Sequence, residues 1–204
     1  MHIAEGVLSP VVLGAGYALT AVGTAIGMRR LDTRRMMTVA MLAAVFFMGS
    51  LIHVPIGVTS AHLLLNGLLG VLLGWAAFPA ILAALFLQAL LFQFGGIAVL
   101  GVNACTMSFG AVMAWGLYRG ICRCWPTHTG QRTAAFLGGA AGVAGAALLT
   151  ALALGFSEEG FIAAAKILFI AHVPVMLAEG CITMFALGFI ARVNPEMLHM
   201  PTGR

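Results

Sequence analysis

The first two residues, Met1 and His2, carry three nitrogen atoms that could bind one metal ion together. The amine of Met1 and the backbone amide of His2 would close a five-membered chelate ring. The same amide and Nδ1 of His2 would close a six-membered ring, which leaves one corner of the plane for another imidazole. Planar nitrogen sites suit nickel and copper, with cobalt as a neighbour in the same affinity series. Because the amide must lose its proton, metal binding should depend on pH. Histidine is too bulky a second residue for ordinary methionine removal, so we expect Met1 to persist.

Two histidines could fill the fourth corner of this plane. His62 follows a loop of small residues, 57–61, and opens an apolar run, whereas His53 lies nine residues earlier. We favour His62, because the orientation derived below puts its loop on the same face of the membrane as Met1. A histidine near the end of a membrane span is often only an interfacial residue, and a histidine at position 2 can be an accident of initiation. Those two readings remain the alternatives at this point.

The composition indicates that these residues belong to an all-α, polytopic membrane protein. Of 204 residues, 62% are hydrophobic and 8% are charged, against about 25% charged in soluble domains. The apolar runs are continuous rather than alternating, which argues against a transmembrane β-barrel, and 26 glycines favour close helix packing in lipid. The net charge of +4 does not indicate a nucleic-acid partner, because the arginines lie between apolar runs as topology signals.

The apolar runs predict about seven transmembrane helices, with six to eight as the range, in one membrane domain covering residues 1–204. Pro174 should divide the last run into a shallow first part and a spanning second part. The predicted spans are Val7–Met28, Met36–Val54, His62–Phe78, Pro79–Phe94, Asn103–Tyr118, Thr133–Phe156 and Phe161–Ile190.

The arginines predict the orientation of these spans. With seven spans, all nine arginines fall on one side of the membrane, which the positive-inside rule makes cytoplasmic. The N-terminus is then outside and the C-terminus is cytoplasmic. The segment Pro55–Ala61 falls on the same outer side as Met1, which brings His62 within reach of the N-terminal chelate. His128 and His199 fall inside and are expected to be bystanders.

Several polar residues within the apolar runs need a partner, because polar groups at membrane depth are costly and often functional. Ser60, Asn66 and Asn103 are expected to hold the metal-binding loop by hydrogen bonds. Glu179 is expected to bond a neighbouring helix, and Gln88 to pack or bond within the bundle.

Nucleotide-binding motifs are missing, since neither G-x-x-x-x-G-K-[ST] nor G-x-G-x-x-G occurs. If transport is powered by ATP, another polypeptide must hydrolyse it. An intramembrane enzyme is an alternative and would pair Glu179 with His172. Their spacing of seven residues puts them on similar helical faces only if Pro174 does not intervene. A purely structural membrane subunit is a third reading.

Four segments carry a resemblance to a known family. The N-terminal string MHIAEGVLSP resembles the signature M-H-I-x-[DE]-G-x-L-S-P of the CbiM/NikM family, the substrate-specific membrane components of energy-coupling-factor (ECF) transporters for cobalt and nickel. The segments PIGVTSAHLLLNG, GGIAVLGVNACTM and HVPVMLAEGCIT, at 55–67, 95–107 and 172–183, resemble three further family segments in the same order. Mild departures are Ala4, Glu5 and Ala61, and none removes a ligand.

The resemblance implies six or seven helices around a small cavity near the outer face, into which the N-terminus inserts. Met1 would supply its amine, His2 its amide and ring nitrogens, and His62 its ring nitrogen. The implied function is the substrate-binding component of an ATP-driven Co²⁺ uptake transporter, with Ni²⁺ as the alternative ion and no further cofactor. Implied partners are a CbiQ-like coupling subunit, CbiO-like ATPases and a small CbiN-like membrane subunit, in a bacterial cytoplasmic (inner) membrane.

Overall fold

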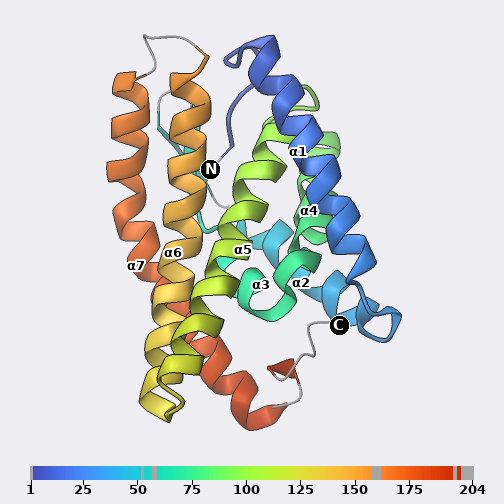
Figure 1. Cartoon of the computed structure of the whole chain (residues 1–204). Coiled ribbons are helices and arrows are strands. Elements are labelled where there is room, and N and C mark those ends of the chain that lie inside the picture. The colour runs from blue at the N-terminus through green and yellow to red at the C-terminus, as the bar shows by residue number, and fades with distance from the viewer. Residues whose placement is uncertain (1, 52, 57–58, 158–161, 195–196, 199–204) are drawn as a thin grey trace.

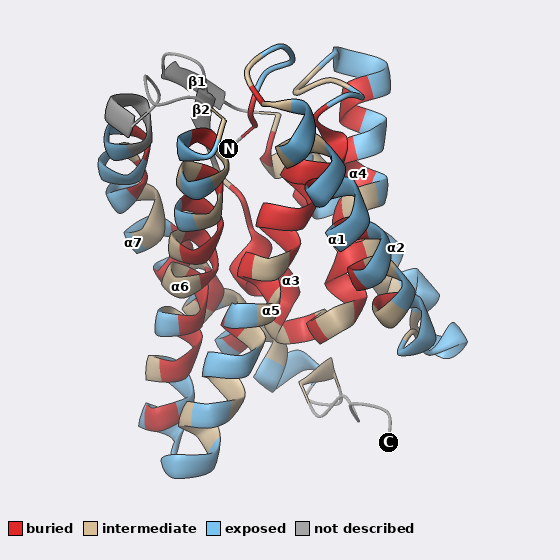
Figure 2. Ribbon diagram, turned by 45° about the horizontal axis from the view of Figure 1, so that its top comes forward, coloured by how far each residue is buried: buried red, intermediate tan, exposed pale blue. Residues whose placement is uncertain are grey.

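The computed structural model describes residues 2–51, 53–56, 59–157, 162–194 and 197–198, and only the backbone of 53–56, 59–62 and 162–165. Seven α-helices within this part of the chain pack into one bundle, with a two-stranded hairpin at one end (Figures 1 and 2). The α-helices are α1 (Pro10–Arg29), α2 (Met36–Gly49), α3 (Asn66–Leu73), α4 (Ala77–Phe92), α5 (Leu100–Cys124), α6 (His128–Gly155) and α7 (Ile162–Val193). Two 3₁₀ turns, η1 (Thr33–Arg35) and η2 (Gly74–Ala76), and strands β1 (His53–Ile56) and β2 (Thr59–His62) complete the order.

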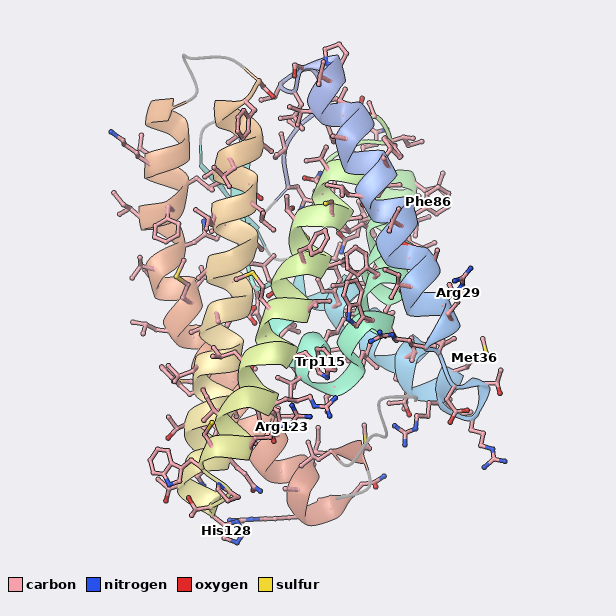
Figure 3. The ribbon with its side chains drawn as sticks, viewed as in Figure 1. Arg29, Met36, Phe86, Trp115, Arg123 and His128 are labelled. Atoms are coloured by element: carbon pink, nitrogen blue, oxygen red, sulfur yellow. The ribbon has the colours of Figure 1, made fainter. Side chains whose placement is uncertain are left out.

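Apolar segments in lipid become helices because each backbone group must then find its partner within the segment. The helix ends follow local chemistry. Pro10 begins α1, where its missing N–H costs nothing, and the Thr127 hydroxyl caps α6 by accepting a hydrogen bond from Gly130 N at 3.1 Å. Large apolar side chains such as Phe185 and Phe189 point outward, 71% and 66% exposed, as expected of a lipid-facing surface. Phe86 likewise points away from the bundle in Figure 3.

The core lies around α5, which is buried along the face that meets α3, α4 and α6 (Figure 2). Leu69, Ile81, Met107 and Val143 belong to its largest cluster and are fully buried. Helix α3 runs alongside α5 in the same direction, because Gly70 lies against Ala111 and Gly74 against Trp115. The chain then reverses at η2, where Gly74 has a φ of +56°. This reversal sends α4 back toward the end of the bundle that holds the N-terminus.

Five helical stretches of the described chain are long and apolar enough to cross a membrane: Pro10–Arg29, Asn66–Phe92, Leu100–Cys124, His128–Gly155 and Lys166–Val193. The stretch Asn66–Phe92 comprises α3, η2 and α4. The chain is therefore a helical, multi-pass membrane protein, as the composition predicts. The predicted span Met36–Val54 is shorter in the structure, because α2 has 14 residues and β1 begins at His53. The predicted break near Trp75 is present as η2, which separates α3 from α4.

Two local predictions were wrong. Pro174 does not divide the last run, since α7 is one helix of 32 residues. A proline removes only one backbone donor, and membrane helices tolerate that loss. The predicted loop Gly57–His62 is a strand over its described residues, since Thr59–His62 form β2, in a segment whose β-branched residues favour a strand. The antiparallel register pairs His53 with His62.

Candidate metal-binding site

The N-terminal segment enters the bundle instead of lying on its surface (Figure 1). His2 is 8% exposed and Ile3 is fully buried. Ile3 belongs to a small apolar cluster with Leu8, Val99, Val102 and Leu154, from the segment itself, the start of α5 and the end of α6. Full burial of such a side chain contributes about 1.5–3 kcal/mol. Ile3 therefore anchors the residue beside His2 in the protein interior.

Asn103 fixes the peptide groups of this segment. Its Oδ1 accepts a hydrogen bond from Ile3 N at 3.0 Å, and its Nδ2 donates to Ile3 O at 3.2 Å. One buried side chain thus satisfies both backbone groups of a buried residue, which would otherwise be costly. Asn103 lies in the first turn of α5, so the backbone next to His2 is tied to a rigid helix.

The segment 93–99, between α4 and α5, lies against the N-terminal segment, and two glycines allow this close approach. Gly95 and Gly96 have φ of +77° and +105°. A Cβ on Gly95 would lie 2.9 Å from Asn103 Nδ2 and 3.4 Å from His2 Cδ2, and one on Gly96 would overlap the Glu5 carboxylate. That carboxylate accepts a hydrogen bond from Ala98 N at 2.9 Å. The glycines therefore let this backbone approach both the His2 ring and its support.

Gln88 contacts the imidazole directly. Its Oε1 lies 3.1 Å from His2 Nε2, and its Nε2 donates to Phe47 O at 3.0 Å and to the Ser50 hydroxyl. The sequence led us to expect only packing or hydrogen bonding within the bundle for Gln88, and its contact with His2 was missed. The available signal was an amide inside an otherwise apolar helix, which marks a functional candidate at membrane depth.

His62 stands on β2 opposite His53, which places the two candidate histidines on one rung of the hairpin. Met1 and the side chains of His53, Ser60 and His62 lie outside the described part of the structure. Of the three expected ligand residues, the structure therefore describes His2 completely, His62 by its backbone and Met1 not at all. Among the described residues no three His, Cys, Asp or Glu side chains lie together as a metal site.

The chain after His62 is held by Glu179. Its Oε1 accepts hydrogen bonds from Leu64 N and Leu65 N, both at 2.5 Å. Leu65 has a left-handed φ of 52° and immediately precedes α3. Glu179 is fully buried on α7, so it fastens the exit of the hairpin to a long helix. This is a structural hydrogen bond to a neighbouring element, of the kind expected for Glu179.

Asn66 and His172 bond elsewhere. Asn66 donates through Nδ2 to Gly142 O at 3.0 Å and joins α3 to α6. The His172 Nδ1 lies 2.7 Å from Leu168 O, one turn earlier on α7. His172 Nε2 and Glu179 Oε2 have no hydrogen-bond partner among the described residues. The structure thus gives Glu179 and His172 separate backbone partners instead of the paired arrangement that an enzyme would use.

His128, which was expected to be a bystander, lies far from this site, and His199 lies outside the described residues. Figure 3 shows Arg123 and His128 toward the end of the bundle opposite the N-terminus. Arg30 packs over Trp75 with its guanidinium carbon 5.7 Å from the ring centroid. Since Trp75 lies in η2, the first arginine-rich turn and the α3–α4 reversal share one end of the bundle.

Comparison with known proteins agrees with this architecture. The CbiM family, described as the cobalt uptake substrate-specific transmembrane region, matches residues 2–197. A Haemophilus influenzae protein described as a metal transport protein is 38% identical over 98% of this chain and 97% of its own length. A fused nickel transport protein NikMN of Rhodobacter capsulatus is 34% identical over 97% of this chain and 64% of its own length.

Other relatives extend the same picture. A cobalt transport protein CbiM of Clostridium tetani is 29% identical over the whole of this chain and 89% of its own length. The crystal structure of a transition metal transporter superposes with a TM-score of 0.83 at 29% identity, covering 96% of this chain and 94% of the other. The family resemblance of the four sequence segments is thus confirmed. The chain belongs to the CbiM family and is a transmembrane component of cobalt and nickel transport.

Proposed function

We propose that this chain captures Co²⁺ outside the cell through the Met1 amine, the His2 amide and Nδ1, and the His62 ring. The observation that supports this most directly is the buried His2, held between Gln88 and the Asn103-bound backbone of Ile3. Burying a polar imidazole is costly, so a histidine at position 2 without a role would be expected at the surface. Its burial favours a ligand over an accident of initiation.

The hairpin with His62 belongs to the same neighbourhood. Gln88 bonds both the His2 ring and the last turn of α2, through Phe47 and Ser50. Ser50 precedes β1 by three residues, and β1 pairs with the strand that carries His62. The strand that carries His62 is therefore linked, through β1 and the end of α2, to the glutamine that bonds His2.

We propose further that the chain is the substrate-specific subunit of an ECF transporter in a bacterial inner membrane. A CbiQ-like coupling subunit, CbiO-like ATPases and a small CbiN-like membrane protein would complete it, and ATP hydrolysis would take place on the partners. The absence of a nucleotide motif from the sequence supports this division of labour. Ni²⁺ is the second candidate substrate, since relatives are named for each metal.

The test compares uptake of Co²⁺ and Ni²⁺ by cells that carry the chain with its partners. We expect uptake of Co²⁺ at lower external concentration than Ni²⁺, and dependence on a functional partner ATPase. Preference for Ni²⁺ would exchange the two substrates, and uptake of neither would remove the transport proposal.

The orientation is tested separately by cysteine labelling in a cysteine-free variant. Arg29, Arg123 and Arg192 lie in the last turns of α1, α5 and α7, so the ends of these helices should be cytoplasmic. Single cysteines at Thr33 and Thr127 should label only from the cytoplasm, and one at Ser157 only from outside. The reverse pattern would place Met1 and His62 inside and overturn capture from outside.

A further inference from the structure

Gln88 makes three hydrogen bonds from the middle of an apolar helix. It is fully buried on α4. Its side-chain nitrogen donates to Phe47 O at 3.0 Å and to the Ser50 hydroxyl, and its oxygen lies 3.1 Å from His2 Nε2. One amide therefore joins the imidazole of the N-terminal segment to the end of α2.

The partners on α2 dictate which way this amide points. The carbonyl of Phe47 can only accept a hydrogen bond. The Ser50 hydroxyl already directs its hydrogen to Phe46 O at 2.9 Å, so toward Gln88 it acts as an acceptor. The carbonyl therefore requires the NH₂ of Gln88 on its side, and the hydroxyl accepts from the same NH₂. A flipped amide would set its oxygen against the Phe47 carbonyl oxygen, and the bond to that carbonyl would be lost.

The direction of the amide in turn dictates the state of His2. Because the Gln88 oxygen facing His2 can only accept, His2 Nε2 must carry a hydrogen and donate it. In the neutral ring the lone pair is then on Nδ1. Only Nδ1 can close a six-membered ring with the amide of the same residue, since Nε2 lies on the far side of the imidazole.

We propose that Gln88 is a positioning residue that holds His2 in the one neutral tautomer able to chelate the transported metal. The proposal rests on the proposed function, because the tautomer matters only if His2 is a ligand. Hydrogen bonds from the distant nitrogen of a metal-binding histidine commonly fix its tautomer and ring orientation. Here the acceptor is a neutral amide, whose own direction is set by α2.

The first test uses Gln88→Met, which keeps the length of the side chain and removes its hydrogen bonds. Histidine labelled with ¹⁵N reports the tautomer in the metal-free protein, with His2 assigned by its loss in His2→Ala. We expect the Nε2–H form in the unaltered protein and a mixture of tautomers in Gln88→Met. Affinity for Co²⁺ should fall roughly 10–100-fold, as for other partners that support a ligand.

A second variant separates this role from a purely structural one. Gln88→Glu, when protonated, keeps an oxygen toward His2 and donates its hydroxyl hydrogen to Phe47 O. Gln88→Glu should therefore retain the Nε2–H tautomer and recover most of the affinity lost in Gln88→Met. The matched control is Gln93→Asn, an exposed glutamine one residue beyond α4 with a φ of 57° that Asn tolerates. It should change neither the tautomer nor the affinity.

The outcomes distinguish this inference from the proposed function. An unchanged His2 tautomer in folded Gln88→Met, or folded Gln88→Glu that behaves like Gln88→Met, would overturn the role of Gln88 while metal capture by His2 could stand. If His2→Ala binds Co²⁺ as well as the unaltered protein, the proposed function fails instead. The metal-free tautomer measurement is valid in either case, because it requires no bound metal.

Discussion

The two segments expected to supply ligands are held in different ways. The N-terminal segment is gripped along its length: Gln88 bonds the ring of His2, Asn103 bonds both backbone groups of Ile3, and Ala98 donates to Glu5. The hairpin of β1 and β2 is fastened at its flanks. Gln88 bonds the end of α2 before it, and Glu179 bonds the two residues before α3 after it.

The difference indicates where positional accuracy comes from in each segment. The N-terminal segment precedes the first helix, and side chains from the bundle bond its residues one after another. A hairpin fixes its own residues through its ladder, and the register pairs His53 with His62. Because the side-chain period of a strand is two, a slip by one residue would turn His62 to the opposite face. We expect the anchors at the two flanks to oppose that slip.

The largest effect should come from changing the chain end itself. A fixed extension before Met1 removes its free amine and adds bulk where the segment enters the bundle, so we expect high-affinity binding of metal to be abolished. The same tag at the C-terminus should be harmless, because the tail follows the helix end that lies away from His2. Bound Co²⁺ per purified protein measures both forms, and equal binding by the extended form would refute the role of the amine.

The next effect ranks the histidines. His2→Ala removes the six-membered ring and the contact with Gln88, whereas His62→Ala removes one ring nitrogen. Loss of a residue that supports a metal ligand typically lowers the affinity about 10–100-fold. Loss of a ligand itself should lower it at least as much, and His2→Ala should have the larger effect of the two. The measurement is Co²⁺ content and uptake in one assay.

Three further histidines are the controls for that ranking. His53→Ala, His128→Ala and His199→Ala should bind nearly normally. Loss of binding in His53→Ala together with survival of His62→Ala would show that the other histidine of the rung is the ligand. The N-terminal chelate would still stand in that case, so this experiment tests the hairpin alone.

The sequence predicts the structure of the N-terminal segment better than that of the β1–β2 hairpin. The family signature at Met1–Pro10 and the composition predicted the membrane class and the entry of the N-terminus into the bundle. They could not predict Gln88, because a single amide in an apolar helix gives no direction until α2 and the N-terminal segment are packed around it. The β1–β2 pairing depends on a two-residue periodicity that is hidden when β-branched, small and apolar residues follow one another.

Pro174 shows the limit of local rules in a membrane. In water a proline ends a helix because solvent competes for the freed carbonyl and because its ring clashes with the preceding turn. In lipid the helix is the least costly backbone on both sides of the proline, and α7 continues through it. The same environment explains why α7 can present both Glu179 and His172 to the interior.

A third prediction concerns the grip on the N-terminal segment. Asn103→Leu leaves the N–H and C=O of Ile3 buried without their partner, at about 1–3 kcal/mol for each unsatisfied group. We expect a roughly tenfold or greater loss of Co²⁺ affinity, with the protein still folded. Asn194→Ala, an exposed asparagine just beyond α7, is the control and should bind normally. If folded Asn103→Leu binds like the unaltered protein, the segment is positioned without Asn103.

The smallest effect should come from the hairpin anchor. Glu179→Gln keeps an oxygen that can accept from Leu64 N and Leu65 N, so we expect almost unchanged affinity for Co²⁺. Glu179→Leu leaves both N–H groups unsatisfied and should lower affinity up to roughly tenfold, because the hairpin transmits only part of the disturbance to His62.

A double-mutant cycle tests whether Glu179 acts through His62. In a His62→Ala background, Glu179→Leu should have no further effect on affinity, whereas Asn103→Leu should still weaken binding. A full additional loss from Glu179→Leu in that background would mean that Glu179 acts on the N-terminal segment as well, and the separation of the two segments would fail.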